Sequence, residues 1–170
     1  MRIAFVIDKI GFSIPLGLAY LSSVLKANGF ELDIFSMAGD LHATIYAIQR
    51  YQPHIIGYSV VTGTQKKYLR INKILKEKLK FYSVFGGPHP TFFPQMIAED
   101  GVDAVCRGEA EEALLDLVKS VDRYKELPEV IANFWVRKGE KIFKNPLRRL
   151  RDDLDILPYP DHKLFLDKFP

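Results

Sequence analysis

Cysteine is almost missing from this sequence of 170 residues, which contains only Cys106. One thiol excludes an internal disulfide, a thiolate-held cluster and a cysteine-based zinc site. Long apolar runs are missing too: no stretch of about 18 apolar residues occurs that could span a membrane. The apolar run at Ile3–Ile7 is too short and too strand-like for a secretory signal. These absences predict a protein of the reducing cytoplasm, with no membrane segment.

The common phosphate-binding fingerprints are also absent. The sequence has neither Gly-x-x-x-x-Gly-Lys-[Ser/Thr] nor Gly-x-Gly-x-x-Gly. Carboxylates at Glu109, Glu111 and Glu112 would repel a phosphate from the helix expected there. Ser59 stands where a phosphorylated receiver domain would need an aspartate. A flavodoxin-like protein that binds FMN or another nucleotide therefore stays only as an alternative.

Basic charge is concentrated late in the chain. The net charge is +3, yet residues 123–151 carry an excess of Lys and Arg over Glu, while the rest is slightly acidic. A nucleic-acid partner would require a basic stripe on the fold itself. The distribution instead indicates a solvated face or a contact with an acidic neighbouring domain.

Strand-like and helix-like periods alternate through the first 122 residues. This rhythm predicts a doubly wound α/β fold, flavodoxin- or Rossmann-like, with five parallel strands in the order 2-1-3-4-5. The expected strands are residues 3–7, 31–35, 54–59, 81–85 and 102–105. The expected helices are residues 14–28, 41–51, 65–80, 92–99 and 109–121.

The alternation stops after Asp122, so we divide the chain into three parts. Residues 1–122 form the α/β domain. Residues 123–145 form an appended β-hairpin, in which Gly139 supplies the turn and Trp135 covers a sheet edge. Residues 146–170 carry four prolines and little periodicity, which predicts an extended tail or linker.

The carboxyl ends of the strands carry small residues. Gly86 and Gly87 follow a buried strand, and a glycine pair there lets a ligand approach bare backbone. Ser59, Thr62 and Thr64 follow the preceding strand, and Gly108 with Glu109 follows the next one. Hydroxyls, glycines and open amides suit a long, mostly neutral ligand in a groove. The apolar loop after the first strand, with Ile10, Phe12 and Pro15, suits a large flat ligand.

Several segments together resemble the N-terminal cobalamin-binding domain of cobalamin-dependent radical S-adenosylmethionine (radical SAM) proteins, and the resemblance covers essentially the whole chain. The segments are Pro15–Leu21, Ile55–Ser59, Gly86–Thr91, Val102–Val105, Arg107–Glu111 and Asp152–Pro160.

The resemblance implies cobalamin as the cofactor and assigns its contacts. Ser59, Thr62 and Thr64 would line the nucleotide tail, Gly86 and Gly87 would give it room, and Gly108 and Glu109 would close the far side. Ile10, Phe12 and Pro15 would meet the corrin, and His89 could approach its edge. With the tail in this groove, Gly87→Leu is expected to abolish binding.

Two departures refine this expectation. The loop after the first strand lacks the Asp-x-His-x-x-Gly whose histidine ligates cobalt in other carriers, so the cofactor is expected base-off without a protein histidine. The cluster motif Cys-x-x-x-Cys-x-x-Cys is also absent.

S-adenosylmethionine and a [4Fe–4S] cluster would accordingly bind outside this chain, in a C-terminal radical SAM barrel of a parent methyltransferase. The chain alone is then not expected to catalyse the reaction. A domain that binds no cofactor and serves only as an interaction surface stays open as a further alternative. The pair Phe92-Phe93 is expected in the core.

Overall fold

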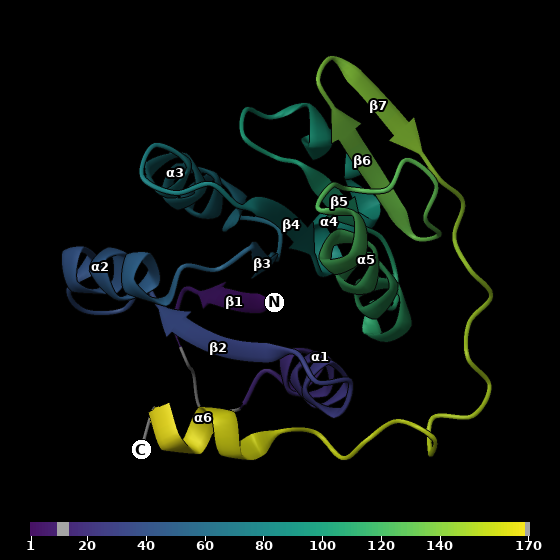
Figure 1. The fold of residues 1–170 in the computed structure, drawn as a ribbon, viewed down its shortest axis with the longest axis horizontal. Helices are drawn as coiled ribbons and strands as arrows, with labels where there is room; N and C mark the ends of the chain where they lie inside the picture. The colour runs from purple at the N-terminus through teal and green to yellow at the C-terminus, as the bar shows by residue number, and fades with distance from the viewer. Residues whose placement is uncertain (10–13, 169–170) are drawn as a thin grey trace.

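The computed structural model describes residues 1–9 and 14–168. In these residues one sheet runs through the molecule in the order β2-β1-β3-β4-β5-β6-β7, with helices on both faces (Figure 1). The strands are β1 (Arg2–Ile7), β2 (Glu31–Ser36), β3 (Ile55–Ser59), β4 (Tyr82–Gly86), β5 (Ala104–Cys106), β6 (Phe134–Lys138) and β7 (Lys141–Lys144). The helices are α1 (Leu16–Ala27), α2 (Leu41–Tyr51), α3 (Gln65–Lys76), α4 (Pro88–Phe92), the 3-10 turn η1 (Pro94–Ala98), α5 (Glu111–Tyr124) and α6 (His162–Lys168).

The first five strands are parallel and follow the predicted order. The central strands are apolar on both sides, as a sheet covered by helices on both faces requires. Ile3, Phe5 and Ile7 face the layer of α1 and α5, whereas Ala4 and Val6 face the layer of α2 and α3. The predicted doubly wound α/β fold is confirmed.

The hairpin of β6 and β7 continues the same sheet. β6 pairs antiparallel with β5, and β7 pairs antiparallel with β6. Gly139 supplies the positive φ of the turn, at 60°. Trp135 lies opposite Val105 on the edge strand of the parallel part. The sheet therefore has seven strands of mixed direction in the described residues, two more than the parallel five.

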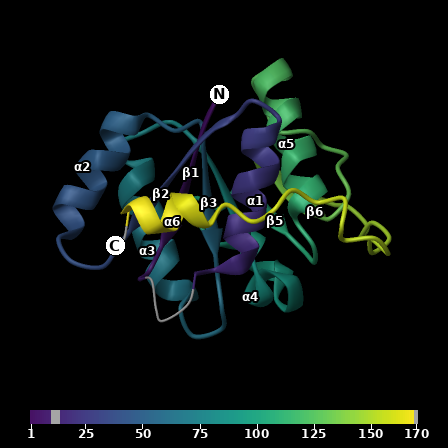
Figure 2. The ribbon, with the colours of Figure 1, turned by 90° about the horizontal axis from the view of Figure 1, so that it is seen from below.

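The tail is not extended throughout. Residues 146–160 cross the α1–α5 face, and the chain then forms α6, which packs on α1 and β2 (Figure 2). Leu164 and Phe165 of α6 are buried in the core cluster of that face. The expectation of an extended tail or linker is therefore wrong for His162–Lys168, which are helical.

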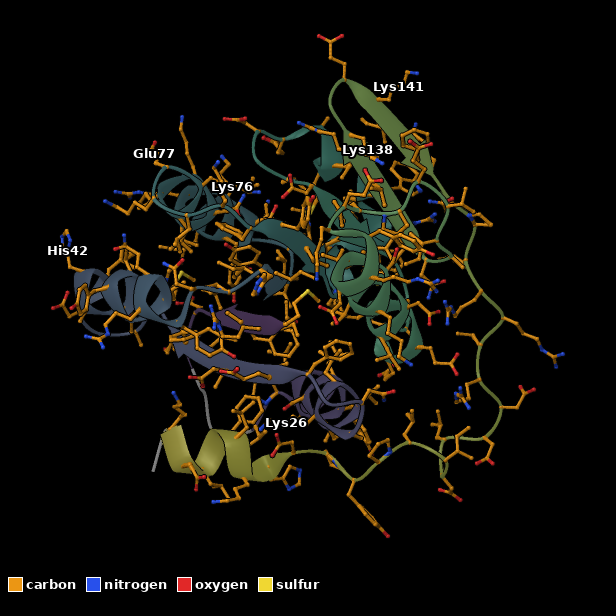
Figure 3. All side chains as sticks on the ribbon, viewed as in Figure 1. Lys26, His42, Lys76, Glu77, Lys138 and Lys141 are labelled. Carbon is orange, nitrogen blue, oxygen red and sulfur yellow. The ribbon has the colours of Figure 1, made fainter. Side chains whose placement is uncertain are left out.

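A polar anchor holds the start of α6 against α1. The Asp161 carboxylate accepts hydrogen bonds from Ser22 Oγ at 2.6 Å and from Lys26 Nζ at 2.6 Å. Lys26 lies in the last turn of α1, close to the start of α6 (Figure 3). Burial alone would raise the pKa of Asp161, but the hydrogen bonds from Lys26, Ser22 and the Leu164 amide outweigh it and lower the pKa.

The Asp161 anchor predicts acid sensitivity. Because the folded pKa lies below the ordinary value, the stabilisation is present above the unfolded pKa of about 4 and is lost as the pH falls through the folded pKa. We expect Asp161→Asn to lower the free energy of unfolding at pH 7 and to flatten its decline below about pH 4. Urea unfolding at several pH values measures both. An identical pH profile in the variant and the parent protein would contradict the anchor.

Candidate functional site

A cavity of about 230 Å³ opens at the carboxyl edge of the sheet, between α1 and α5. Strands β1, β3, β4 and β5 all end there. Its wall is made mainly of apolar side chains and glycines. The lining residues are Phe5, Pro15, Leu16, Gly17, Leu18, Leu21, Gly57, Tyr58, Ser59, Val84, Gly86, Gly87, Cys106, Gly108, Glu109, Ala110, Glu111 and Leu114.

Strand register builds the inner wall. Phe5, Gly57 and Val84 lie abreast on β1, β3 and β4. Gly57 has no side chain here, and a Cβ at its position would lie 2.8 Å from the Phe5 ring. The glycine thus leaves room for the ring, which forms part of the cavity wall.

One step nearer the edge, Gly86 lies beside Ser59 and Cys106. A Cβ at Gly86 would meet Cys106 Cβ at 3.7 Å, an ordinary contact. The absence of a side chain at Gly86 therefore keeps cavity space open. Glycine is not needed at this position to avoid a clash.

Gly87 serves a different purpose. Its φ is 94°, a region that favours glycine, and a Cβ would lie 3.0 Å from the amide nitrogen of Val60. The Val60 amide donates to the Gly86 carbonyl at 2.8 Å, and the His89 amide donates to the Val60 carbonyl at 2.9 Å. These two hydrogen bonds hold the backbone that follows β3 against the backbone that follows β4. Gly87 is needed for the backbone, so Gly87→Leu would disturb the fold before it tested a ligand.

The helix after the glycine pair begins earlier than predicted. α4 begins at Pro88, a residue suited to the first position of a helix, and η1 covers only Pro94–Ala98 of the expected segment 92–99. This placement turns Phe92 and Phe93 outward, with 77% and 45% of their surface exposed. The expectation that they belong to the core is wrong.

Charge is sparse in the cavity. Among its lining residues no Lys, Arg or His occurs, and the two carboxylates are not buried: Glu109 is exposed and Glu111 is half-buried. Cys106 is almost fully buried, and this burial, with a smaller contribution from Glu111, raises the pKa of its thiol to about 12. The cavity therefore presents a neutral interior.

The raised thiol pKa predicts low reactivity. The thiolate is the nucleophile, so Cys106 in the folded protein should react with iodoacetamide at pH 8 far more slowly than in the unfolded chain. We expect a difference of at least ~100-fold, which mass spectrometry of timed aliquots with and without denaturant would measure. Equal rates would show that the thiol is open to solvent.

The structure brings six predicted site residues to one cavity: Pro15, Ser59, Gly86, Gly87, Gly108 and Glu109. Thr62 and Thr64 do not line it. Thr64 Oγ1 donates to the Val61 carbonyl, and Thr62 Oγ1 lies 3.2 Å from His89 Nδ1 on the outer rim. The His89 ring stacks on Phe93 with centroids 5.1 Å apart. Ile10 and Phe12 lie outside the described residues.

Sequence reasoning missed one whole side of the cavity. Gly17, Leu18 and Leu21 come from α1, Glu111 and Leu114 come from α5, and Ala110 directly precedes α5. Their helical spacing indicated only a core face. Gly57 did carry a signal, because a glycine inside an apolar strand often marks a close approach.

Within the described residues, no cluster of three or more His, Cys, Asp or Glu side chains is placed to hold a metal ion. No helix among the described elements has the length and apolarity needed to cross a membrane.

Comparison with protein families identifies the family of this chain. The family model of the B12 binding domain matches residues 5–118, which include every residue that lines the cavity. The chain belongs to this family. The resemblance inferred from the sequence motifs is thereby confirmed.

Curated relatives of this B12-binding chain are longer proteins. An uncharacterized methyltransferase of Pyrococcus horikoshii is 32% identical over 91% of this chain and 35% of its own length. An anaerobic magnesium-protoporphyrin IX monomethyl ester cyclase of Rubrivivax gelatinosus is 37% identical over 64% of this chain and 21% of its own length. The chain thus spans about a third or less of these relatives.

Solved structures share the fold. The cobalamin-dependent S-adenosylmethionine radical enzyme OxsB with aqua-cobalamin bound has a TM-score of 0.77, 21% identity, and coverage of 94% of this chain and 24% of that chain. The radical S-adenosylmethionine methyltransferase TsrM of Kitasatospora setae, with cobalamin and a [4Fe–4S] cluster bound, also has a TM-score of 0.77, with 15% identity and coverage of 93% and 31%.

Proposed function

We propose that this domain binds cobalamin base-off and without a protein histidine on cobalt, with the nucleotide tail in the α1–α5 cavity and the corrin over the carboxyl edge of the sheet. The observation that carries the proposal is the neutral cavity, kept open by Gly86 in a chain of the B12-binding family. A slender, largely uncharged arm fits such a cavity better than a free phosphate would.

The residues fit the cofactor in a specific way. Gly86 leaves cavity space for the tail, the side chains of Leu18, Leu21 and Leu114 would exclude water, and Ser59 offers a hydroxyl to the tail. Pro15 and Leu16 stand at the edge where a corrin would rest. Bound cobalamin supplies a cobalt centre able to carry a methyl group, while the protein positions and shields it.

Hydroxocobalamin binding tests the proposal. The purified protein should retain one equivalent through gel filtration, seen by its absorption spectrum. After reduction to the cobalt(II) form, electron paramagnetic resonance should show no nitrogen splitting from an axial ligand. No retention would end the proposal of binding. Nitrogen splitting that disappears in His89→Ala would replace the histidine-free state by ligation through His89. Yellow protein with bound FMN would favour the flavodoxin-like alternative.

We further propose that the domain serves a cytoplasmic radical SAM methyltransferase whose barrel lies elsewhere in the parent polypeptide and holds S-adenosylmethionine and the [4Fe–4S] cluster. Relatives about three or more times longer than this chain support this organisation. The parent gene should then encode Cys-x-x-x-Cys-x-x-Cys beyond Pro170. A natural stop codon at that point would contradict it.

A further inference from the structure

The inner part of the α1–α5 cavity is apolar on every side. Phe5 and Val84 project from the sheet, and Leu18 and Leu114 face them from α1 and α5. All four are buried. The two carboxylates are less buried: Glu109 precedes α5 and is exposed, and Glu111, the first residue of α5, is half-buried.

Few polar groups are free in this inner part to hydrogen-bond a ligand. The backbones of Phe5, Gly57 and Val84 are paired with one another within the parallel sheet. Among the side chains of the wall, Ser59 has a hydroxyl and Cys106 a protonated thiol, which is a weak donor. The inner cavity can thus form a hydrogen bond with about one polar atom of a buried ligand.

The size of the cavity admits an aromatic group of two rings. An apolar cavity of about 150 Å³ accommodates benzene. The cavity here measures about 230 Å³. A fused bicyclic base fits this space, and the apolar wall favours one with few polar edges.

We propose that the cavity selects corrinoids whose lower base is a benzimidazole over those whose base is a purine, an inference that rests on the proposed cobalamin function. A benzimidazole displaced from cobalt presents one free ring nitrogen, to which the Ser59 hydroxyl can donate a hydrogen bond. Adenine adds an exocyclic amine and further ring nitrogens. Because a polar atom buried without a hydrogen-bond partner weakens binding, the adenine form should bind at least ~10-fold more weakly.

Three corrinoids test the selection by absorbance titration. They are hydroxocobalamin, its analogue with adenine as the lower base, and cobinamide, which has no base. We expect the affinities to fall from cobalamin to the adenine form, and cobinamide to bind at least ~10-fold more weakly than cobalamin.

Other results of the titration would contradict either the selection or the proposed function. Equal affinity for cobinamide and cobalamin would show that no base enters the cavity. Equal or tighter binding of the adenine form would overturn the selection, with Glu111 as the acceptor for its amine, and would leave the proposed function intact. Failure of all three corrinoids to bind would refute the proposed function itself.

Two substitutions at Cys106 sharpen the test. Cys106→Ser adds a hydroxyl to the wall with little change in volume, and should narrow the gap between cobalamin and the adenine form about threefold or more. Cys106→Val keeps the wall apolar and should preserve the gap. Thermal unfolding of both variants shows whether they are folded. If both variants fold and show the same ratio of cobalamin affinity to adenine-form affinity, the base does not lie against Cys106. That result would overturn the proposed placement of the base in the inner cavity.

Discussion

Replacing Gly86 with leucine is expected to weaken cobalamin binding by ~100-fold or more while the protein stays folded. The position tolerates a side chain, because its φ lies outside the positive region and a Cβ would meet only Cys106 Cβ at 3.7 Å. The rest of the leucine would extend into the cavity and occupy space that the nucleotide tail needs. Extended backbone such as that at the end of β4 also favours leucine over glycine, so the free energy of unfolding should change by less than about 1 kcal/mol.

Gly86→Ala and Gly87→Ala complete this comparison. Alanine at 86 fills less of the cavity and should weaken binding by only about 10-fold or less. Alanine at 87 meets the backbone of Val60 at 3.0 Å with a φ of 94°, and should lower the free energy of unfolding by about 1–3 kcal/mol. Absorbance titration and urea unfolding measure the two quantities separately. Unchanged affinity in folded Gly86→Leu would show that the tail does not use this cavity.

The sheet could be predicted because its signals are local. Uninterrupted apolar runs such as Ile3–Ile7 mark strands buried on both faces, and the helices between them require parallel pairing. A glycine pair after such a run marks the carboxyl edge of the sheet. The sequence therefore located the edge that carries the cavity, together with Ser59 and Gly108 on its rim.

The cavity wall could not be predicted in full because it depends on packing between distant helices. Leu18 and Leu114 are far apart in sequence and come to the same cavity only because α1 and α5 cover one face. The two glycines also have different tasks, which only φ and the surrounding atoms distinguish. Thr62 looked like a groove residue, but its position in the turn before α3 directs its hydroxyl toward His89.

The C-terminal helix shows how tertiary packing overrides a weak local signal. α6 has seven residues, fewer than an isolated helix needs to be stable in water. Its stability must therefore come from contacts with α1 and β2 and from the anchor at Asp161. The proline-rich approach to it gave no hint of these contacts.

Phe165→Ala should accordingly destabilise the domain strongly. The side chain is 1% exposed and belongs to the core cluster of the α1–α5 face. Truncating a buried phenylalanine removes apolar contacts and leaves a cavity, at a cost of about 3–5 kcal/mol. Leu166 is 61% exposed on the same helix, so Leu166→Ala should change the free energy of unfolding by no more than about 0.5 kcal/mol.

Urea unfolding of both variants separates an integral helix from a loose tail. If α6 is part of the cooperative fold, Phe165→Ala shifts the midpoint of the whole transition, and the far-ultraviolet signal of the sheet and helices moves with it. If the helix were only a tether, the two variants would unfold like the parent protein. Because α6 packs against α1, which forms one wall of the cavity, Phe165→Ala should also weaken cobalamin binding by about 3-fold or more, whereas Leu166→Ala should not. A destabilised variant with full affinity would show that the α1 wall keeps its position without α6.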